Sequence, residues 1–359
     1  MRSENASLTE LANRGLRVLY ELVSIPSPSG KEGKAVKYLL RAADELGLEA
    51  WVDRAGSFYA TAPRSQSPVV ALVSHVDTVR DWYPARLEGD TVYGRGAVDA
   101  KGPLVSMLIS LALVAATEPE APVMVAGLVG EEADSPGAKY FLRTAPRSLK
   151  HIVIGEPTGC TRVAIGYRGS AKIRVVCRGR GGHSASPEPG SSALEKAAKL
   201  VLELGSRGRS VAETSFTPVQ LVAGDGSNIV PMRAEMLLDT RIPPGKNLDD
   251  ALRELEELLP SSCEARPVGE YVEPVKVSLN KPVPRALIRA ILLAGKKPIP
   301  VIKAGTSDMN YLVRLTESIA AYGPGDPGLA HTRDEKLSLS EIKLAIKVYT
   351  ETIKQLTRY

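Results

Sequence analysis

The sequence predicts an α/β protein with a mostly parallel sheet, into which a smaller α+β domain is inserted. Apolar runs typical of buried strands alternate with helical segments up to about residue 166, and this pattern returns after about residue 274. Between these two parts the elements follow a different order. A chain of 359 residues is also longer than one ordinary hydrophobic core supports, so two domains are expected.

The outer parts of the chain, residues 1–166 and 275–359, form the predicted parallel domain. Leucines recur at helical spacing between Leu8 and Leu22 and predict an N-terminal amphipathic helix, which the prolines after residue 25 end. Further helices are expected at 33–46, 101–116 and 135–142, and buried strands at 68–74, 122–129 and 151–154.

The inserted part, residues 167–274, predicts a domain of its own. Apolar and charged residues alternate over 170–178, as in a strand with one buried face. The order strand, helix, strand, strand, helix, strand is that of a ferredoxin-like sandwich. After the first strand, a helix is expected at 190–204, strands at 216–223 and 234–241, a helix at 248–259 and a short strand at 263–267.

The composition is that of a soluble globular protein, with 43% hydrophobic and 24% charged residues. No apolar run approaches the roughly 20 residues of a membrane span, the polar N-terminus does not resemble a secretory signal, and no nucleic-acid-binding motif is present. We therefore expect a cytoplasmic protein without a membrane or nucleic-acid partner. Cys160, Cys177 and Cys263 form no CxxC pair, so we expect small buried side chains rather than metal ligands or disulfides.

The net charge of +5 is a mild excess, but one stretch of the chain is densely basic. Two explanations stay open. The stretch forms an electropositive face that attracts an acidic partner, or its residues are the outward side chains of a strand. The basic residues of this stretch are Arg162, Arg168, Lys172, Arg174, Arg178 and Arg180.

Candidate metal ligands follow each of the three buried strands predicted in the outer domain. In an open α/β sheet, ligands bind at the carboxyl ends of the strands, so we expect these side chains to lie close together. Each alone has an ordinary explanation, as a structural histidine, a polar loop or a turn carboxylate. The residues that come directly after these strands are His75, Glu131, Glu132 and Glu156.

Two further candidate ligands lie elsewhere in the outer domain. Asp99 follows a glycine-rich segment just before a predicted helix, where it either caps the helix or bridges two cations with its two oxygens. His331 follows a loop rich in glycine and proline. Imidazole and carboxylate donors without a thiolate favour Zn²⁺, with Co²⁺ and Mn²⁺ as substitutes.

Two more residues, and one of the glutamates already named, have chemistry that a hydrolytic metal site uses. Asp77, two residues after His75, can orient that imidazole. Of the adjacent glutamates, one can bind metal while the other acts as a general base toward water. His183, which follows two glycines in the inserted domain, either donates a hydrogen bond to a developing oxyanion or is an ordinary loop histidine.

Taken together, these spaced motifs resemble the zinc-dependent aminoacylase/carboxypeptidase family, which includes acetylornithine deacetylases and succinyl-diaminopimelate desuccinylases. The resemblance covers essentially the whole chain and implies a two-domain di-zinc peptidase fold. It implies that two Zn²⁺ bind in each subunit and that Asp99 bridges them. His75 and Glu156 would complete one site, and Glu132 and His331 the other.

The same resemblance implies roles for the remaining candidates. Glu131 would be the general acid/base, Asp77 would support His75, and His183 would reach the transition state. The inserted domain would act as a lid and form a homodimer. Arg241 would bind a substrate carboxylate, as a bidentate guanidinium can, and Asn228 would lie near the oxyanion.

The segment around residues 303–310 resembles a narrower group within the family, the hydrolases that release lysine or ornithine from a small acidic amino-group carrier protein. The bond cleaved would join the carrier's C-terminal glutamate side chain to the α-amino group of the amino acid. A small-substrate deacylase, desuccinylase or dipeptidase and, more remotely, a non-catalytic metal-binding interaction protein are the alternatives. The resemblance makes four residues of this segment candidates for substrate binding: Lys303, Gly305, Thr306 and Ser307.

Overall fold

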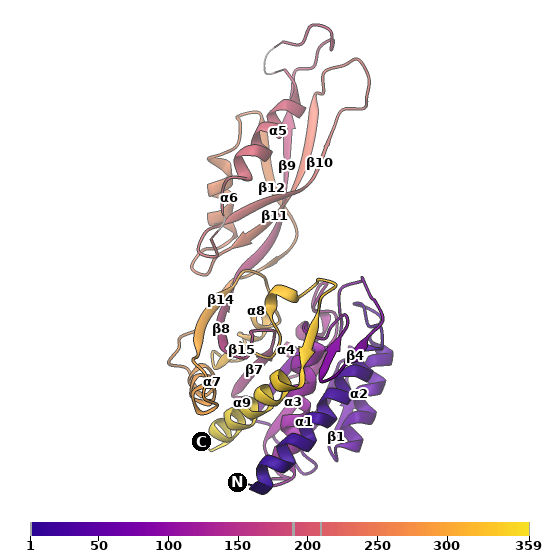
Figure 1. The fold of residues 1–359 in the computed structure, drawn as a ribbon. Helices are drawn as coiled ribbons and strands as arrows, with labels where there is room; N and C mark the ends of the chain where they lie inside the picture. Colours follow the sequence, from indigo (N-terminus) through magenta and orange to yellow (C-terminus); the bar gives the residue numbers. More distant parts are fainter. Residues whose placement is uncertain (1, 189–190, 209, 359) are drawn as a thin grey trace. The chain divides into compact units, whose positions relative to one another are not determined.

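The chain forms two compact units, which Figure 1 shows in a computed structural model that describes residues 2–188, 191–208 and 210–358. Among the described residues, no helix is both long and apolar enough to cross a membrane. Unit 1 consists of Met1–Ile165, Val277–Val301 and Tyr311–Tyr359, and unit 2 of Gly166–Lys276 and Ile302–Asn310.

Unit 2 includes a segment that the sequence analysis placed in the outer domain, residues 302–310. Main-chain hydrogen bonds explain its position. The main-chain N–H of Arg168 donates to the oxygen of Lys303 at 3.2 Å. The amide of Asn310 donates to the main-chain oxygens of Arg168 and Glu273, at 3.2 and 2.8 Å. This segment is therefore tied to both ends of the inserted part.

The largest sheet, whose strands lie mostly in unit 1, is parallel at its centre and antiparallel at its edges. Strands β6, β3, β7 and β15 are parallel neighbours, whereas β1, β2 and β8 pair antiparallel. Two short strands, β13 and β14, pair with β8. The chain passes between the two units within β8 and again within β14. In sheet order, the strands are β1 (Glu49–Val52), β2 (Phe58–Thr61), β6 (Val123–Leu128), β3 (Val70–His75), β7 (His151–Gly155), β15 (Ile319–Tyr322), β8 (Arg162–Tyr167) and β13 (Val275–Lys276), with β14 (Ile299–Lys303).

Helices pack on this sheet, and those predicted from the sequence are confirmed. Helix α3 is apolar on nearly all sides and is buried against the sheet, α1 and α9. A separate small sheet contains β4 (Arg86–Glu88), β5 (Thr91–Tyr93) and β16 (Lys336–Ser338). The helices are α1 (Arg2–Val23), α2 (Gly33–Glu45), α3 (Lys101–Ala115), α4 (Pro136–Thr144), α7 (Pro282–Leu293), α8 (Met309–Leu312), the 3-10 turn η1 (Pro327–Leu329) and α9 (Leu339–Thr357).

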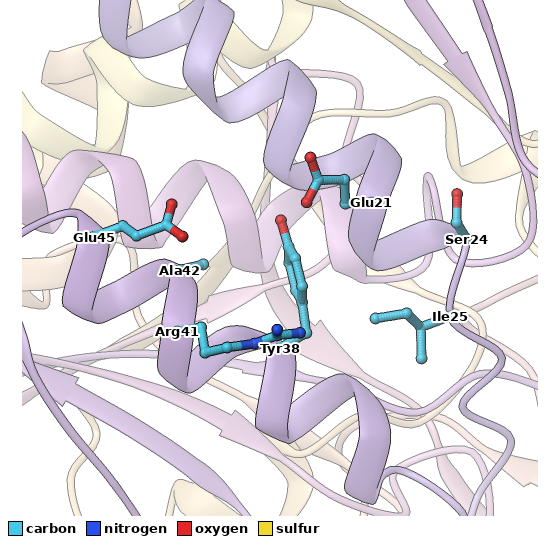
Figure 2. Close-up of a pocket in the computed structure, with 7 residues that line it drawn as sticks. All are labelled: Glu21, Ser24, Ile25, Tyr38, Arg41, Ala42 and Glu45. Atoms are coloured by element: carbon cyan, nitrogen blue, oxygen red, sulfur yellow. The ribbon is translucent and has the colours of Figure 1, made fainter.

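The first two helices enclose a small polar pocket of about 340 Å³ (Figure 2). The hydroxyl of Tyr38 on α2 points toward Glu21 on α1, and the Arg41 guanidinium lies 6.0 Å from the Tyr38 ring centre. Burial and the nearby Glu21 carboxylate raise the pKa of Tyr38. None of the site residues predicted from the sequence lines this pocket.

Unit 2 has the predicted ferredoxin-like order of elements. Its four-stranded sheet is antiparallel throughout, with the order β10-β11-β9-β12. The predicted helix start at residue 190 lies outside the described residues, and the described helix begins at Ala193. The elements are β9 (Gly169–Arg178), α5 (Ala193–Leu204), β10 (Ser215–Ala223), β11 (Arg233–Ile242), α6 (Leu248–Glu256) and β12 (Cys263–Val272).

The cysteines of unit 2 correct one expectation from the sequence. Cys177 on β9 and Cys263 on β12 form a disulfide, so the prediction that no cysteine is disulfide-bonded is wrong. They are 86 residues apart and share no motif, but the first and last strands of the unit pair directly at these positions, with a Cα–Cα distance of 4.0 Å. Cys160 remains a buried thiol, as expected.

Candidate metal centre

Three adjacent parallel strands end at the candidate centre. Strand β3 ends at His75 itself, β6 ends shortly before Glu131 and Glu132, and β7 ends one residue before Glu156. Since β3 lies between β6 and β7, their carboxyl ends bring these side chains to one edge of the sheet. The ring of His75 is almost completely buried, with 1% of the residue exposed.

Asp99 lies between the two imidazoles of this centre. Its Oδ1 is 3.3 Å from Nε2 of His75, and its Oδ2 is 3.3 Å from Nε2 of His331. His331 Nε2 is also 2.9 Å from Oε1 of Glu132, while His75 Nε2 is 3.9 Å from Oε1 of Glu156. The two oxygens of Asp99 therefore face two different clusters of donor atoms.

The donor atoms form groups that can each hold a metal ion. Asp99 belongs to one group with His75 and Glu156, and to another with Glu132 and His331; in each group the donor atoms lie within 4.8 Å of one another. A third group joins His75 to both adjacent glutamates. Imidazole nitrogens and carboxylate oxygens are suitable donors for divalent zinc, cobalt or manganese, so the residues present fit such ions.

The protonation of the two histidines reflects the surrounding carboxylates. Hydrogen bonds with Asp99 and Glu132 raise the pKa of His331 to about 10. Burial lowers the pKa of His75, but hydrogen bonds with Asp77 and Asp99 outweigh it and raise that pKa well above its ordinary value. A metal ion binds an imidazole nitrogen only when that nitrogen carries no proton. Metal binding by His75 and His331 is therefore expected to release protons.

Asp77 connects the imidazole of His75 to the glutamate pair. Its main-chain oxygen lies 3.0 Å from Nδ1 of His75, which fixes the ring so that Nε2 faces the centre. Its carboxylate accepts hydrogen bonds from the main-chain N–H groups of Glu131 and Glu132, at 3.1 and 3.0 Å. It also accepts one from the hydroxyl of Ser29 at 2.7 Å. A single buried residue, Asp77, thus orients both sides of the centre through its main-chain oxygen and its carboxylate.

A buried ion pair, Arg95–Glu335, supports the centre and was not identified from the sequence. Glu335 Oε2 accepts main-chain N–H groups from the loop that carries Asp99, including that of Asp99 itself at 3.4 Å. Arg95 pairs with the other oxygen of Glu335 and donates to the main-chain oxygen of His331 at 3.2 Å. The sequence signal that could have indicated this pair is Arg95 itself, a charged residue within the glycine-rich segment 94–102.

In unit 2, the structure brings His183 and Asn228 onto neighbouring segments. His183 forms an isolated bridge with Ile229, and the main-chain N–H of Ser184 donates to the oxygen of Asn228 at 2.9 Å. The imidazole is exposed, and its Nδ1 accepts the N–H of Ala185 at 3.1 Å. That contact occupies Nδ1 of the imidazole.

The other candidates of unit 2 lie at different positions within it. The guanidinium of Arg241 pairs with Asp239 on the same strand, at 3.0 Å. The Lys303 ammonium lies 5.6 Å from the ring centre of Tyr167. Ser307 is buried, and its hydroxyl accepts the N–H of Met309; Gly305 is exposed and Thr306 is half-buried.

The stretch of basic residues does not form one uniform charged face. Lys172, Arg178 and Arg180 pair with Asp239, Glu264 and Glu188 respectively. Arg168 is buried, whereas Arg162 and Arg174 are exposed. Lys172, Arg174 and Arg178 lie on β9 at its less buried positions, so the explanation that they are outward side chains of a strand fits these three residues.

Most of the chain matches the model of a known protein family. Residues 71–355 match the model of peptidase family M20/M25/M40. The chain belongs to this family. A protein of Aeropyrum pernix is 43% identical over 343 residues, covering 94% of both chains. The LysW-lysine/LysW-ornithine hydrolase of Saccharolobus solfataricus is 37% identical over 344 residues, covering 94% of this chain and 95% of that protein.

Solved structures of family M20 share this fold at low sequence identity. A tripeptidase of Staphylococcus aureus superposes with a TM-score of 0.82 at 20% identity, covering 97% of this chain and 99% of that one. A dinuclear metal-binding M20 peptidase of Bacillus subtilis gives a TM-score of 0.76 at 14% identity, covering 96% and 98%. The chain thus has the M20 fold, with a mixed sheet that is mostly parallel at its centre.

Proposed function

We propose that this protein is a metal-dependent amide hydrolase that releases lysine, ornithine or both from a small acidic amino-group carrier protein in amino-acid biosynthesis. One observation supports the chemistry most directly. Asp99 lies between His75 and His331, with an additional carboxylate, Glu131, at 3.9 Å from His75 Nε2. The names of relatives that match 94% of the chain support the carrier-bound substrate.

Two divalent cations would bind in each subunit, with zinc as the proposed metal and cobalt or manganese as substitutes. Asp99 would bridge the two ions. When bound, they would supply Lewis acidity toward a carbonyl oxygen and toward water. The ligands we propose are His75 and Glu156 on one side of Asp99 and Glu132 and His331 on the other.

Glu131 would move the proton during hydrolysis. Its main-chain N–H is fixed by Asp77, while its side chain reaches the edge of the centre. We propose that its carboxylate accepts a proton from the attacking water and returns it to the leaving amine. His183 would donate a hydrogen bond to the developing oxyanion, and Asn228, on the neighbouring segment, would assist it.

Substrate recognition would depend on polar groups of unit 2. Arg241 would bind a carboxylate through its planar guanidinium. The segment that carries Lys303, Gly305, Thr306 and Ser307 would bind the remainder of the carrier-linked amino acid.

We also propose that the protein is a cytoplasmic homodimer that associates through unit 2. Strand β10 is an edge strand of the unit 2 sheet and presents unpaired main-chain groups. It also exposes apolar side chains, with 52% of Val219, 37% of Leu221 and 58% of Val222 accessible. A second copy of the chain that covers this edge would remove both features from water.

Intact-mass spectrometry of a charged carrier protein tests this function. Carrier loaded with lysine or ornithine is incubated with the zinc-loaded enzyme, with a chelator-treated sample as the control. The proposal predicts loss of one lysine or ornithine mass, abolished by the chelator. An unchanged carrier together with rapid hydrolysis of N-acetylornithine or a dipeptide would instead assign a small-substrate function, and no hydrolysis of any amide would support a non-catalytic metal-binding protein.

A further inference from the structure

The carboxylate of Asp77 has a hydrogen-bond donor to which the proposed function gives no role, the hydroxyl of Ser29. Asp77 is fully buried. Its Oδ1 accepts the main-chain N–H of Glu131 at 3.1 Å, and its Oδ2 accepts that of Glu132 at 3.0 Å. The Ser29 hydroxyl donates to the same Oδ2 at 2.7 Å, the shortest of the three bonds. A buried carboxylate has lost its bonds with water, so each donor that the chain supplies helps to keep it in place.

The segment that carries Ser29 runs beside the residues that follow His75. The main-chain N–H of Thr78 donates to the oxygen of Ser27 at 2.9 Å, and the N–H of Ser29 donates to the oxygen of Thr78 at 3.3 Å. The buried hydroxyl of Ser27 donates to the main-chain oxygen of Val76 at 2.9 Å. These three bonds fix the main chain on both sides, so the Ser29 hydroxyl is already in position to donate to Asp77.

Lys101 fixes the other end of the same segment. It is fully buried and lies two residues after Asp99, at the start of α3. Its Nζ donates to the main-chain oxygens of Leu22 and Ile25, at 3.0 and 2.8 Å. Residues 22–25 are the point at which the chain leaves α1. The side chain of Lys101 therefore ties the end of α1 to the loop that presents Asp99.

We infer that residues 22–29, the bracing segment, hold the two sides of the metal centre at a fixed separation, with Ser29 and Lys101 as positioning residues. One end of the bracing segment is bonded to Lys101, beside Asp99, and the other end is bonded to the carboxylate of Asp77. All of these residues lie within unit 1. The inference rests on the proposed function in one respect, because it takes the centre to bind metal.

Zinc affinity tests the role of Ser29. Competition titration against a chromogenic chelator is expected to show about 10-fold weaker zinc binding by Ser29→Ala than by the wild type, the usual effect of losing a residue that orients a ligand. Ser29→Thr keeps the hydroxyl and should restore most of the affinity. A wild-type affinity in Ser29→Ala, or a loss of affinity that Ser29→Thr does not reverse, would overturn the inference.

Ser148→Ala is the matched control for a structural role. The Ser148 hydroxyl is also half-buried and donates to the main-chain oxygen of Pro68, likewise at 2.7 Å. Pro68 precedes β3, the strand whose other end is His75. Ser148→Ala should bind zinc as the wild type does. If it loses as much affinity as Ser29→Ala, the hydroxyl of Ser29 contributes only to the general stability of the fold, and the inference is wrong.

A double-mutant cycle tests whether Ser29 and Lys101 act through one segment. Lys101→Met removes the donor that holds the end of α1, and about 10-fold weaker zinc binding is expected. If the bracing segment joins the two residues, the double variant should lose little more affinity than the weaker-binding single variant. Independent effects would multiply to about 100-fold and would contradict the inference. If Lys101→Met does not fold, Ser27→Ala, which removes the bond from the same segment to Val76, takes its place in the cycle.

Hydrogen exchange of the metal-free protein separates this inference from the proposed function. A wild type that binds no zinc would refute the proposed function, and the positions of the main-chain groups would then test the bracing segment alone. The amides of Glu131 and Glu132 are expected to exchange about 10-fold faster in Ser29→Ala than in the wild type, because their acceptor is less firmly held. Ser148→Ala should leave these two rates unchanged. Wild-type rates in Ser29→Ala, or an equal increase in both variants, would overturn the inference.

Discussion

The buried carboxylate of Glu335 pairs with the guanidinium of Arg95, and this pair joins the two loops that present Asp99 and His331. Glu335 is fully buried, and Arg95 is 2% exposed. The pair forms hydrogen bonds with main-chain atoms of Asp99 and His331, not with the side-chain atoms that would bind metal. It fixes the distance between two candidate ligands that are far apart in sequence but must act together.

We predict that Glu335→Gln weakens both the fold and metal binding. The substitution leaves Arg95 as an uncompensated buried charge, which typically destabilises a protein by about 3–5 kcal/mol. Metal affinity should fall about 10- to 100-fold, as for other residues that orient ligands. Denaturant unfolding and metal-competition titration measure the two effects. The control Glu88→Gln removes an exposed ion pair with Arg86 and should change neither.

The adjacent glutamates should respond differently to the same substitution. Glu131→Ala is expected to retain both metal ions and to lose about 10²-fold or more in kcat, the usual contribution of general acid–base catalysis. Glu132→Ala should instead lose metal, because its Oε1 lies 2.9 Å from the donor nitrogen of His331. Metal content and kcat are measured on both variants. Near-normal turnover by metal-replete Glu131→Ala would rule out the role assigned to Glu131.

The disulfide predicts a specific thiol count. Denatured without reductant, the protein should have one reactive thiol, that of Cys160, and reduction should increase the count to three. Replacing Cys177 and Cys263 with serine should destabilise unit 2 by about 2–4 kcal/mol, since the bond closes a loop of 86 residues. Thiol titration with a chromogenic disulfide gives the count. Three thiols in the unreduced protein would show that the bond does not form.

His151 should make stability depend on pH. Burial and the neighbouring Lys150 lower the pKa of His151, whose Nδ1 lies 2.8 Å from the hydroxyl of Ser318. Between this lowered value and the ordinary pKa near 6.5, the unfolded chain binds more protons. The free energy of unfolding therefore rises with pH through this window and levels off above it.

His151→Asn should remove that part of the pH dependence. Unfolding midpoints of the metal-loaded wild type and variant are compared between about pH 5 and pH 8, around the ordinary histidine pKa. The difference between the two proteins should be larger at the high end, where the neutral imidazole stabilises the wild type. A constant difference across the range would mean that His151 does not titrate as described.

The sequence predicted the elements of this fold because their signals are local. Strand β3 and helix α3 both have long apolar stretches, and both occur where the sequence places them. The side chains at the strand ends also meet as expected. Parallel neighbours end at the same edge of a sheet, so His75 and Glu156 become neighbours without any direct sequence signal between them.

The features that were missed depend on contacts between distant segments. No pattern near Cys177 indicates that its strand pairs with the strand of Cys263, so the disulfide was unexpected. Glu335 is one of many acidic residues near the C-terminus, and its function depends on a loop that lies about 240 residues earlier. Asn310 likewise joins unit 2 through two hydrogen bonds that no local pattern indicates.

Metal stoichiometry tests whether the centre holds two metal ions that share Asp99 as a ligand. The wild type and Asp99→Ala are dialysed to equilibrium against zinc, and bound metal is counted per chain by mass spectrometry. We expect two zinc ions per wild-type chain, as in two-metal hydrolytic sites. The variant should bind fewer than two, because Asp99 is the donor shared by the group with His75 and the group with His331. A wild-type chain that binds one zinc ion or none, or an Asp99→Ala variant that still binds two, would contradict this expectation.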